Sequence, residues 1–231
     1  MKKRFLSLLL CFSLLCLPVN AEENEQLVAL TFDDGPSGRF TRRLLEGLEA
    51  RGAKATFLLC GYRIEQYPEL TERIFREGHE IGLHGFSHKS MKNMCRRDVE
   101  QEIRQTIALI PDGCKISFLR PPGGLCGNGV RSAAADQELA VLTWSVDPRD
   151  WAIDDAETIQ EDVLRRVRDG DVILLHDMSD SSVDAALAIV DALQKQAYRF
   201  VTASELAQAK GITLIPGKEY TRFVRTDPGL K

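Results

Sequence analysis

The sequence has no excess of positive charge. Its 30 Lys and Arg residues stand against 34 Asp and Glu residues, which gives a formal net charge of −4 at pH 7. Removing residues 1–21 would remove Lys2, Lys3 and Arg4 and no acidic residue, so these three charges change the total from −4 to −7. An acidic domain has no electrostatic basis for binding nucleic acid, and we expect no such partner.

Long apolar runs are also absent. The longest, residues 5–19, is shorter than the ~20 residues that a helix needs to span a bilayer. It follows the basic start MKKR and ends in Val19-Asn20-Ala21 before Glu22, a small-x-small pattern typical of a cleavage site. We therefore predict a signal peptide over residues 1–21, in preference to an uncleaved anchor. The mature protein would be secreted or cell-wall associated, with no stable membrane span.

The cysteines lack any zinc-binding spacing, because there is no CxxC motif and no Cys/His cluster. A structural zinc site is therefore not expected. Four cysteines follow the signal peptide: Cys60, Cys95, Cys114 and Cys126. In an exported protein they permit two disulfides with three connectivities. Free thiols are an equal alternative, because a chain of about 210 residues can build a core that is stable without disulfide cross-links.

No linker, repeat or low-complexity stretch divides the chain, and we predict a single domain over residues 22–210. The segment 211–231 contains Pro216, Gly217, Pro228 and Gly229 and is predicted to be a surface tail. Short apolar runs alternate with amphipathic stretches such as 96–110 and 181–197, which predicts a parallel α/β fold. The predicted strands are residues 27–32, 54–59, 79–84, 115–119, 139–146, 171–176 and 199–202.

Polar residues follow the predicted strands at one end. Asp33, His84, Arg120, Asp150 and His176 lie at or just past the carboxyl ends of the first, third, fourth, fifth and sixth strands. In a parallel barrel these ends converge on the face where barrel enzymes hold their active sites. An open parallel sheet would also gather them along one edge. Either arrangement brings residues from distant parts of the chain together.

Two histidines and a carboxylate form a candidate metal site. His84 and His88 are spaced i, i+4 after a strand end, and Asp34 belongs to the Asp33-Asp34 pair that follows the first strand. Taken alone, the histidine pair is most often a coincidence on a surface turn. Its predicted position beside two carboxylates favours a divalent metal with an open coordination position. Asp33 and His176 remain as base and acid, so the chain is predicted to be a metal-dependent hydrolase.

Five motifs then carry a resemblance. The chain resembles the polysaccharide deacetylases of carbohydrate esterase family four, which share the chitooligosaccharide-deacetylase homology domain. The resemblance covers residues 27 to about 206 and implies a distorted parallel (β/α)₇ barrel. In the family's order, the motifs are Thr31-Phe32-Asp33-Asp34-Gly35-Pro36-Ser37, His84 to His88, Arg120-Pro121-Pro122-Gly123-Gly124, Asp147-Pro148-Arg149-Asp150-Trp151 and Leu174-Leu175-His176-Asp177.

The resemblance assigns roles around the metal. Asp34, His84 and His88 would bind one divalent metal per chain, with Zn²⁺ the expected ion. Asp33 would be the general base that takes a proton from water. Arg120 would hold Asp33 in place.

It also assigns roles around the substrate. His176 would be the general acid that protonates the leaving nitrogen, and Asp150 would orient it. The Gly123 N–H would stabilise the oxyanion. Leu174 and Trp151 would wall the pocket for the acetyl methyl group. The implied reaction is de-N-acetylation of a glycan with release of acetate.

The implied substrate is an N-acetylated polysaccharide, with the N-acetylglucosamine of peptidoglycan the first expectation for an exported protein. Chitin oligomers and O-acetylated xylan use the same chemistry. Two positions depart from the family pattern. Gly85 stands where Ser or Thr is usual, and Gly123 where an aromatic residue is frequent. Both departures bear on the substrate rather than on the reaction, and a monomer is the default expectation.

Three other interpretations compete with this one. A non-catalytic glycan-binding envelope protein would keep the barrel without turnover, and Gly85 and Gly123 leave this open. An aspartate-nucleophile phosphotransferase needs its two aspartates separated by one residue, whereas Asp33 and Asp34 are adjacent, and it has no use for the histidine pair. Related barrels that open cyclic amides sometimes lack the same metal triad, and the intact set of two histidines and one aspartate in this chain argues against them.

Overall fold

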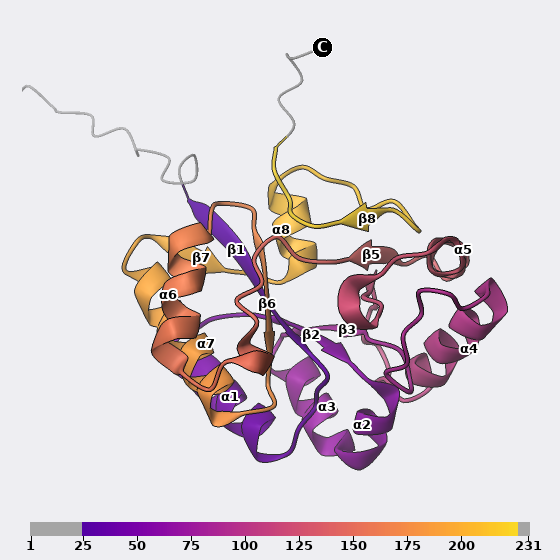
Figure 1. Cartoon of the computed structure of the whole chain (residues 1–231), viewed down its shortest axis with the longest axis horizontal. Helices are drawn as coiled ribbons and strands as arrows, with labels where there is room; N and C mark the ends of the chain where they lie inside the picture. The colour runs from indigo at the N-terminus through magenta and orange to yellow at the C-terminus, as the bar shows by residue number, and fades with distance from the viewer. Residues whose placement is uncertain (1–24, 226–231) are drawn as a thin grey trace, which may run out of the picture.

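The structure is a computed structural model, and it describes residues 25–225. The predicted signal peptide, residues 1–21, lies outside these residues. Within the described part, no helix is long and apolar enough to cross a membrane. Strands and helices alternate along the chain from the first described residues onward (Figure 1).

The elements have the following bounds. The strands are β1 (Gln26–Asp33), β2 (Thr56–Leu59), β3 (Glu80–Leu83), β4 (Phe118–Leu119), β5 (Ala140–Leu142), β6 (Val172–His176), β7 (Tyr198–Phe200) and β8 (Glu219–Tyr220). The α-helices are α1 (Arg39–Ala50), α2 (Gly61–Gln66), α3 (Pro68–Arg76), α4 (Arg96–Ile107), α5 (Asn128–Asp136), α6 (Ala156–Arg166), α7 (Asp180–Gln194) and α8 (Ala203–Ala209). Two short 3-10 helices are η2 (Pro122–Gly124) and η3 (Asp150–Ala152).

The strands curl into a distorted parallel barrel, which confirms the predicted fold class. The sheet order is β6-β1-β2-β3-β4-β5-β8, and β7 pairs with β1. After β5 the chain bends back toward β6, where Val146 forms a parallel bridge with Ile173. The Leu174 N–H donates to the Val146 carbonyl at 2.9 Å. This bridge connects the chain just after β5 to the second residue of β6 and so closes the ring of strands.

The distortion begins in β1, which is longer than its neighbours. Its first residues, 26–28, pair with β7, whereas Ala29 to Asp33 pair with β6. The Val28 carbonyl accepts from the Val201 N–H after β7, whereas the Leu27 carbonyl accepts from the Gly170 N–H before β6. Because the backbone groups of neighbouring strand residues point to opposite edges, β7 lies on the edge of β1 that β2 occupies farther along, and β6 lies on the other edge. At the amino-terminal end, β8 pairs with β5 and fills the space between β5 and β6.

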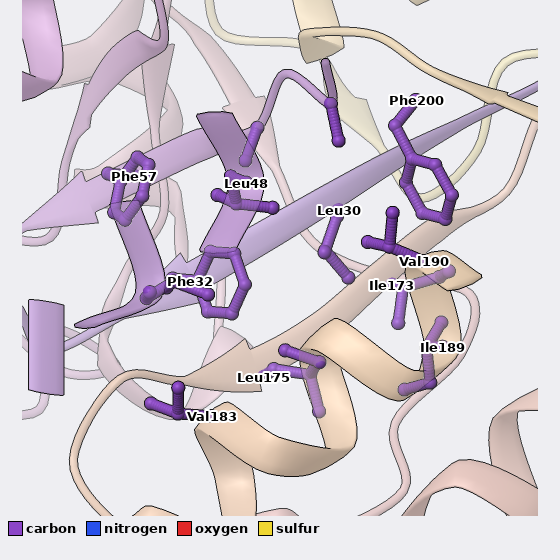
Figure 2. Close-up of a cluster of buried hydrophobic side chains, with 14 of the residues drawn as sticks. Leu30, Phe32, Leu48, Phe57, Ile173, Leu175, Val183, Ile189, Val190 and Phe200 are labelled. Carbon is purple, nitrogen blue, oxygen red and sulfur yellow. The ribbon is translucent and has the colours of Figure 1, made fainter. Parts of the chain in front are cut away.

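A layer of helices covers the outside of the barrel (Figure 1). Apolar side chains fill the space between the helices and the strands. Leu30 and Phe32 of β1 and Ile173 and Leu175 of β6 point outward toward α7, as Figure 2 shows. These side chains are at most 1% exposed. Because side chains alternate along a strand, the residues between them point into the barrel. The outward positions supply packing, and the inward positions of β1 are free for other roles.

The predicted strands are all present, and two are much shorter than expected. Of the run 115–119, only Phe118–Leu119 is a strand. Of the run 139–146, only Ala140–Leu142 is a strand. Beyond it, the Thr143 N–H still donates to the Tyr220 carbonyl, and Ser145 and Val146 donate to Val172. The apolar run is therefore a strand followed by a bend to a second partner, which an apolar pattern alone does not reveal.

The prediction of a surface tail after residue 211 was wrong for residues 219–223. Tyr220 lies in β8, and Phe223 is fully buried against Phe118 and Tyr220, with ring centroids at 6.4 and 5.5 Å. The Phe223 N–H donates to the Gly170 carbonyl at 2.8 Å. Gly170 must lack a side chain, because a Cβ there would lie 1.9 Å from the Phe223 carbonyl oxygen. The Pro and Gly residues that suggested a tail flank aromatic residues that close the barrel's amino-terminal end.

The disulfide alternatives are also resolved in this structure. Cys60, Cys95, Cys114 and Cys126 are all free thiols. Cys60 is buried, and burial, followed by the charges of Asp34 and Asp33, raises the pKa of its thiol. The core therefore forms without a cross-link within residues 25–225.

Truncating the buried ring at the closed end should cost much of the fold's stability. Phe223→Ala is expected to lower the free energy of unfolding by about 3–5 kcal/mol, because it leaves a cavity between β8 and the barrel. Val224→Ala is the matched control, since Val224 is 44% exposed and its truncation should change stability by less than about 0.5 kcal/mol. Urea denaturation of both variants measures the difference. Equal, small effects would show that residues 219–223 do not belong to the core.

Candidate active site

The two aspartates at the end of β1 point in different directions. Thr31 and Asp33 alternate with the outward-facing residues of β1 and so face the barrel interior, where Asp33 is 3% exposed. The next residue, Asp34, has a φ of 71°, so the chain leaves the strand there in a left-handed conformation. This turn directs the Asp34 carboxylate to the barrel mouth. The adjacent acids therefore have separate environments.

The Arg120 side chain fills the interior beneath the mouth and is 0% exposed. Its Nη1 donates to Asp33 Oδ1 at 2.6 Å and to Thr31 Oγ1 at 2.9 Å. Its Nε and Nη2 donate to the carbonyls of Leu142 and Thr143 at 3.0 and 2.9 Å. A buried guanidinium requires such partners. Asp33 is thus held on one oxygen, and its Oδ2 remains directed toward His84.

The tautomer of His84 follows from its hydrogen bond. His84 is 2% exposed, and its Nδ1 lies 2.8 Å from the Arg120 carbonyl oxygen. A carbonyl only accepts, so Nδ1 carries a proton, and in the neutral imidazole Nε2 then presents a lone pair. That Nε2 lies 3.3 Å from Asp34 Oδ1 and 3.7 Å from Asp33 Oδ2. His84 is therefore oriented as a metal ligand, with its second nitrogen bonded as such ligands require.

His88 completes a cluster of three ligand atoms that lie within 4.8 Å of one another. Its Nε2 is 2.9 Å from Asp34 Oδ1, and that oxygen is buried and receives no hydrogen bond. Burial would raise the pKa of Asp34, but the two imidazoles outweigh it and hold this pKa well below its usual range. The carboxylate is therefore ionised and faces two nitrogen atoms. A divalent cation between them satisfies all three groups, so the residues fit a metal.

His176, at the end of β6, is held by the buried carboxylate of Asp150 in η3. His176 Nδ1 donates to Asp150 Oδ1 at 2.8 Å, and the His176 backbone N–H donates to Oδ2 at 2.8 Å. Burial alone would lower the pKa of His176. The hydrogen bond to Asp150 and the charges of Asp33 and Asp34 overcome this and raise it to about 9. The imidazole is therefore protonated at neutral pH and its Nε2 carries a proton that it can donate.

A cavity of about 450 Å³ lies at the barrel mouth. Eight of the ten residues predicted for the site line it, and the other two, Arg120 and Asp150, lie directly behind Asp33 and His176. The eight are Asp33, Asp34, His84, His88, Gly123, Trp151, Leu174 and His176. The structure thus brings together every residue predicted for the site.

A second cavity, of about 540 Å³, continues from the first. Asp34, Trp151 and His176 line both cavities, and Trp151 is 69% exposed between them. The rest of its lining combines apolar and hydroxyl side chains, among them Ile153 and Ser181, with the acidic residues Asp150 and Asp154. The site is therefore a groove with room on both sides of Trp151.

Several residues at the site were not found from the sequence. Trp144 lines the first cavity, and its ring lies 5.6 Å from the Arg120 guanidinium carbon. The fully buried Asp177 accepts a hydrogen bond from Thr41, and its carbonyl accepts one from Ser37, which ties the loop after Asp34 to β6. Burial raises the pKa of Asp177 to about 7. Ser37 and Asp177 belong to two of the motifs without an assigned role, whereas Trp144 lay inside the predicted strand 139–146, so no sequence signal marked it.

Comparisons with known proteins agree with this geometry. A family model described as polysaccharide deacetylase matches residues 20–142. A peptidoglycan-N-acetylglucosamine deacetylase of Bacillus cereus is 39% identical over 193 residues, which cover 81% of this chain and 91% of the relative.

Two solved structures share the fold. The peptidoglycan deacetylase PdaC from Bacillus subtilis superposes with a TM-score of 0.77 at 35% identity, over 81% of this chain and 93% of that one. A family 4 acetyl xylan esterase from Clostridium thermocellum, in complex with a cobalt ion, has a TM-score of 0.79 at 33% identity. That match covers 85% of this chain and 98% of the esterase.

Metal binding and proton transfer should separate by mutation. His84→Ala removes one of three ligand atoms and is expected to abolish high-affinity Zn²⁺ binding. Asp33→Asn should keep it, because Asp33 lies behind the cluster and an amide oxygen still accepts from Arg120. Isothermal titration of the metal-stripped proteins with Zn²⁺ measures both. Strong binding by the His84 variant would remove His84 from the ligand set.

Proposed function

Because this chain belongs to the polysaccharide deacetylase family, we propose that it removes the acetyl group from N-acetylglucosamine residues of peptidoglycan. It is a hydrolase that acts on carbon–nitrogen bonds other than peptide bonds. The observation that carries the proposal is the three-atom ligand cluster beside a carboxylate held by Arg120. The site is complete within one chain, so the proposal requires only a monomer.

We propose that the metal is Zn²⁺, bound by Asp34, His84 and His88. The family depends on a divalent metal. Two imidazole nitrogens and one carboxylate oxygen suit zinc and leave a coordination position for substrate or water. When bound, the cation supplies a Lewis acid that polarises the acetyl carbonyl and makes water more acidic.

The remaining residues divide the proton transfers between them. Asp33 Oδ2 faces the cluster, because Arg120 occupies the other oxygen, and it takes the proton from the attacking water. The Gly123 N–H stabilises the negative charge that develops on the carbonyl oxygen; loss of such a donor typically costs roughly 10²–10³ in rate. Leu174, which is 3% exposed, and Trp151 bound the space for the acetyl methyl group.

His176 completes the reaction by protonating the departing sugar nitrogen, since an amine anion does not leave unassisted. Its raised pKa supports this role, because the imidazole already carries the proton at neutral pH. Asp150 keeps Nδ1 occupied and so directs Nε2 into the groove. The products are acetate and a glucosamine residue within the glycan.

The substrate is proposed from the relatives and from the groove. A relative with 39% identity is named for peptidoglycan N-acetylglucosamine, and an exported protein meets that polymer. The second cavity beyond Trp151 has room for a neighbouring sugar, with an aromatic ring and hydroxyl groups at its wall. We propose export from the sequence of residues 1–21, which lie outside the described part.

Acetate release tests the proposed function directly. Protein comprising residues 22–231 is stripped with a chelator, reconstituted with Zn²⁺ and given peptidoglycan, N-acetylglucosamine tetramer, the monosaccharide or acetylated xylan. We expect release from peptidoglycan and the tetramer that disappears on stripping and returns with metal. The monosaccharide should react more slowly, because it leaves the second cavity empty.

The other outcomes identify the alternatives. Release from acetylated xylan alone would make the chain an O-acetyl esterase like the Clostridium thermocellum relative. No release from any substrate, with Zn²⁺ bound, would favour a non-catalytic glycan-binding protein.

The pH dependence of kcat/KM should reflect the protonation of His176, which Asp150 supports. Activity requires protonated His176, so it is lost as pH rises through the pKa of this group. Asp150→Asn removes the carboxylate that raises that pKa and should move the alkaline limb of kcat/KM down by about 1–2 pH units. A bound cation would lower the pH of the alkaline limb in both proteins. The variant is therefore compared with the parent enzyme loaded with the same metal. An unchanged limb would assign the acid role to another group.

A further inference from the structure

The loop between the two histidine ligands has no regular secondary structure. Gly85, Phe86 and Ser87 separate His84 from His88 and lie in neither helix nor strand. Their peptide groups must therefore find partners outside the loop. His88 itself has a φ of 57°, a left-handed conformation that is unfavourable for residues other than glycine. Contacts around the loop must hold His88 in the position of a ligand.

The N–H groups at the amino-terminal end of α2 donate hydrogen bonds to the carbonyl groups of the loop. The Gly61 N–H donates to the Gly85 carbonyl at 2.9 Å, and the Tyr62 N–H donates to the Phe86 carbonyl at 3.0 Å. Phe86 packs so closely on Gly61 that a Cβ there would lie 2.3 Å from Phe86 Cδ2. These contacts fix one side of the loop and leave its N–H groups to be satisfied from the other.

Glu102 of α4 satisfies them. Its Oε2 accepts hydrogen bonds from the Phe86 and Ser87 backbone N–H groups at 2.7 and 2.8 Å. Its Oε1 accepts one from Ser87 Oγ at 2.7 Å. Hydrogen bonds to an ionised carboxylate are stronger than those between neutral groups. Three of them from one side chain define the position of a loop more tightly than packing alone.

We propose that Glu102 is the positioning residue that holds His84 and His88 at the spacing needed for the metal, an inference that rests on the proposed function. Gly85 has a φ of 80°, and a Cβ at this position would lie 3.3 Å from Glu102 Oε2 and 2.5 Å from Met91 Cε. The loop thus excludes the hydroxyl-bearing side chain that the family usually carries there. Glu102 supplies the anchor from the neighbouring helix.

Three variants of α4 separate this role from general stability. Glu102→Ala removes all three hydrogen bonds and should raise the Kd for Zn²⁺ by about 10–100-fold. Glu102→Gln should stay within a few-fold of the parent, because its amide oxygen accepts from both N–H groups and its nitrogen donates to Ser87 Oγ. Glu100→Ala is the matched control. Glu100 lies on the same helix, but its carboxylate pairs with Arg96 and Arg104.

The measurements are the Zn²⁺ Kd by competition with a chromophoric chelator and hydrogen exchange at the Phe86 and Ser87 amides. We expect Glu102→Ala to weaken binding and to lose protection at both amides, with the other two variants close to the parent. A parent-like Kd, or unchanged protection, in Glu102→Ala would overturn the proposal. So would equal losses in Glu100→Ala, because they would indicate general loosening of α4.

Should Glu102→Ala fail to fold, Ser87→Ala replaces it. This variant removes one of the three hydrogen bonds and should raise the Kd by a smaller factor of about 2–10. An unchanged Kd there would count against the proposal. These measurements involve no substrate, so a parent that binds Zn²⁺ but releases no acetate would refute the proposed function and leave the role of Glu102 intact. A parent that binds no Zn²⁺ would refute both.

Discussion

A single buried guanidinium organises the interior of this barrel. Arg120 comes from the end of β4, and its donors reach Thr31 and Asp33 of β1 and the carbonyls of Leu142 and Thr143 at the end of β5. A charge in this position is costly unless each donor has a partner. Removing the residue would therefore leave several acceptors unpaired at once. The three strands are registered to one another by this requirement as well as by their packing.

The same residue acts on the proposed site through two different groups. Its guanidinium holds the carboxylate of Asp33, and its backbone carbonyl fixes the tautomer of His84. The proposed base and the first histidine ligand are therefore positioned by one residue. His176 follows the same rule through Asp150. In each case the group that faces the groove owes its orientation to a buried partner behind it.

Much of this arrangement could be predicted from the sequence, because apolar runs that end in charged residues are unusual. The runs before Asp33, His84 and His176 predicted both the strands and the end of the barrel that holds the site. Two features were not predictable in this way. The segment 219–223 is short and flanked by turn residues, so only its burial shows that it is part of the core. Glu102 occupies a polar position of an amphipathic helix, where a carboxylate usually faces solvent, and only the fold brings the loop to it.

The two walls of the groove have an optical consequence. The chain contains two tryptophans in total, Trp144 and Trp151, and both line the cavity that holds the ligand cluster. Trp144 stacks near the Arg120 guanidinium, whereas Trp151 is largely in solvent at the rim. The tryptophan fluorescence of the protein therefore arises at the site, from one partly shielded and one largely hydrated indole. Binding of a glycan against Trp151 would therefore shift the tryptophan emission maximum to shorter wavelength, and no added label is needed to measure it.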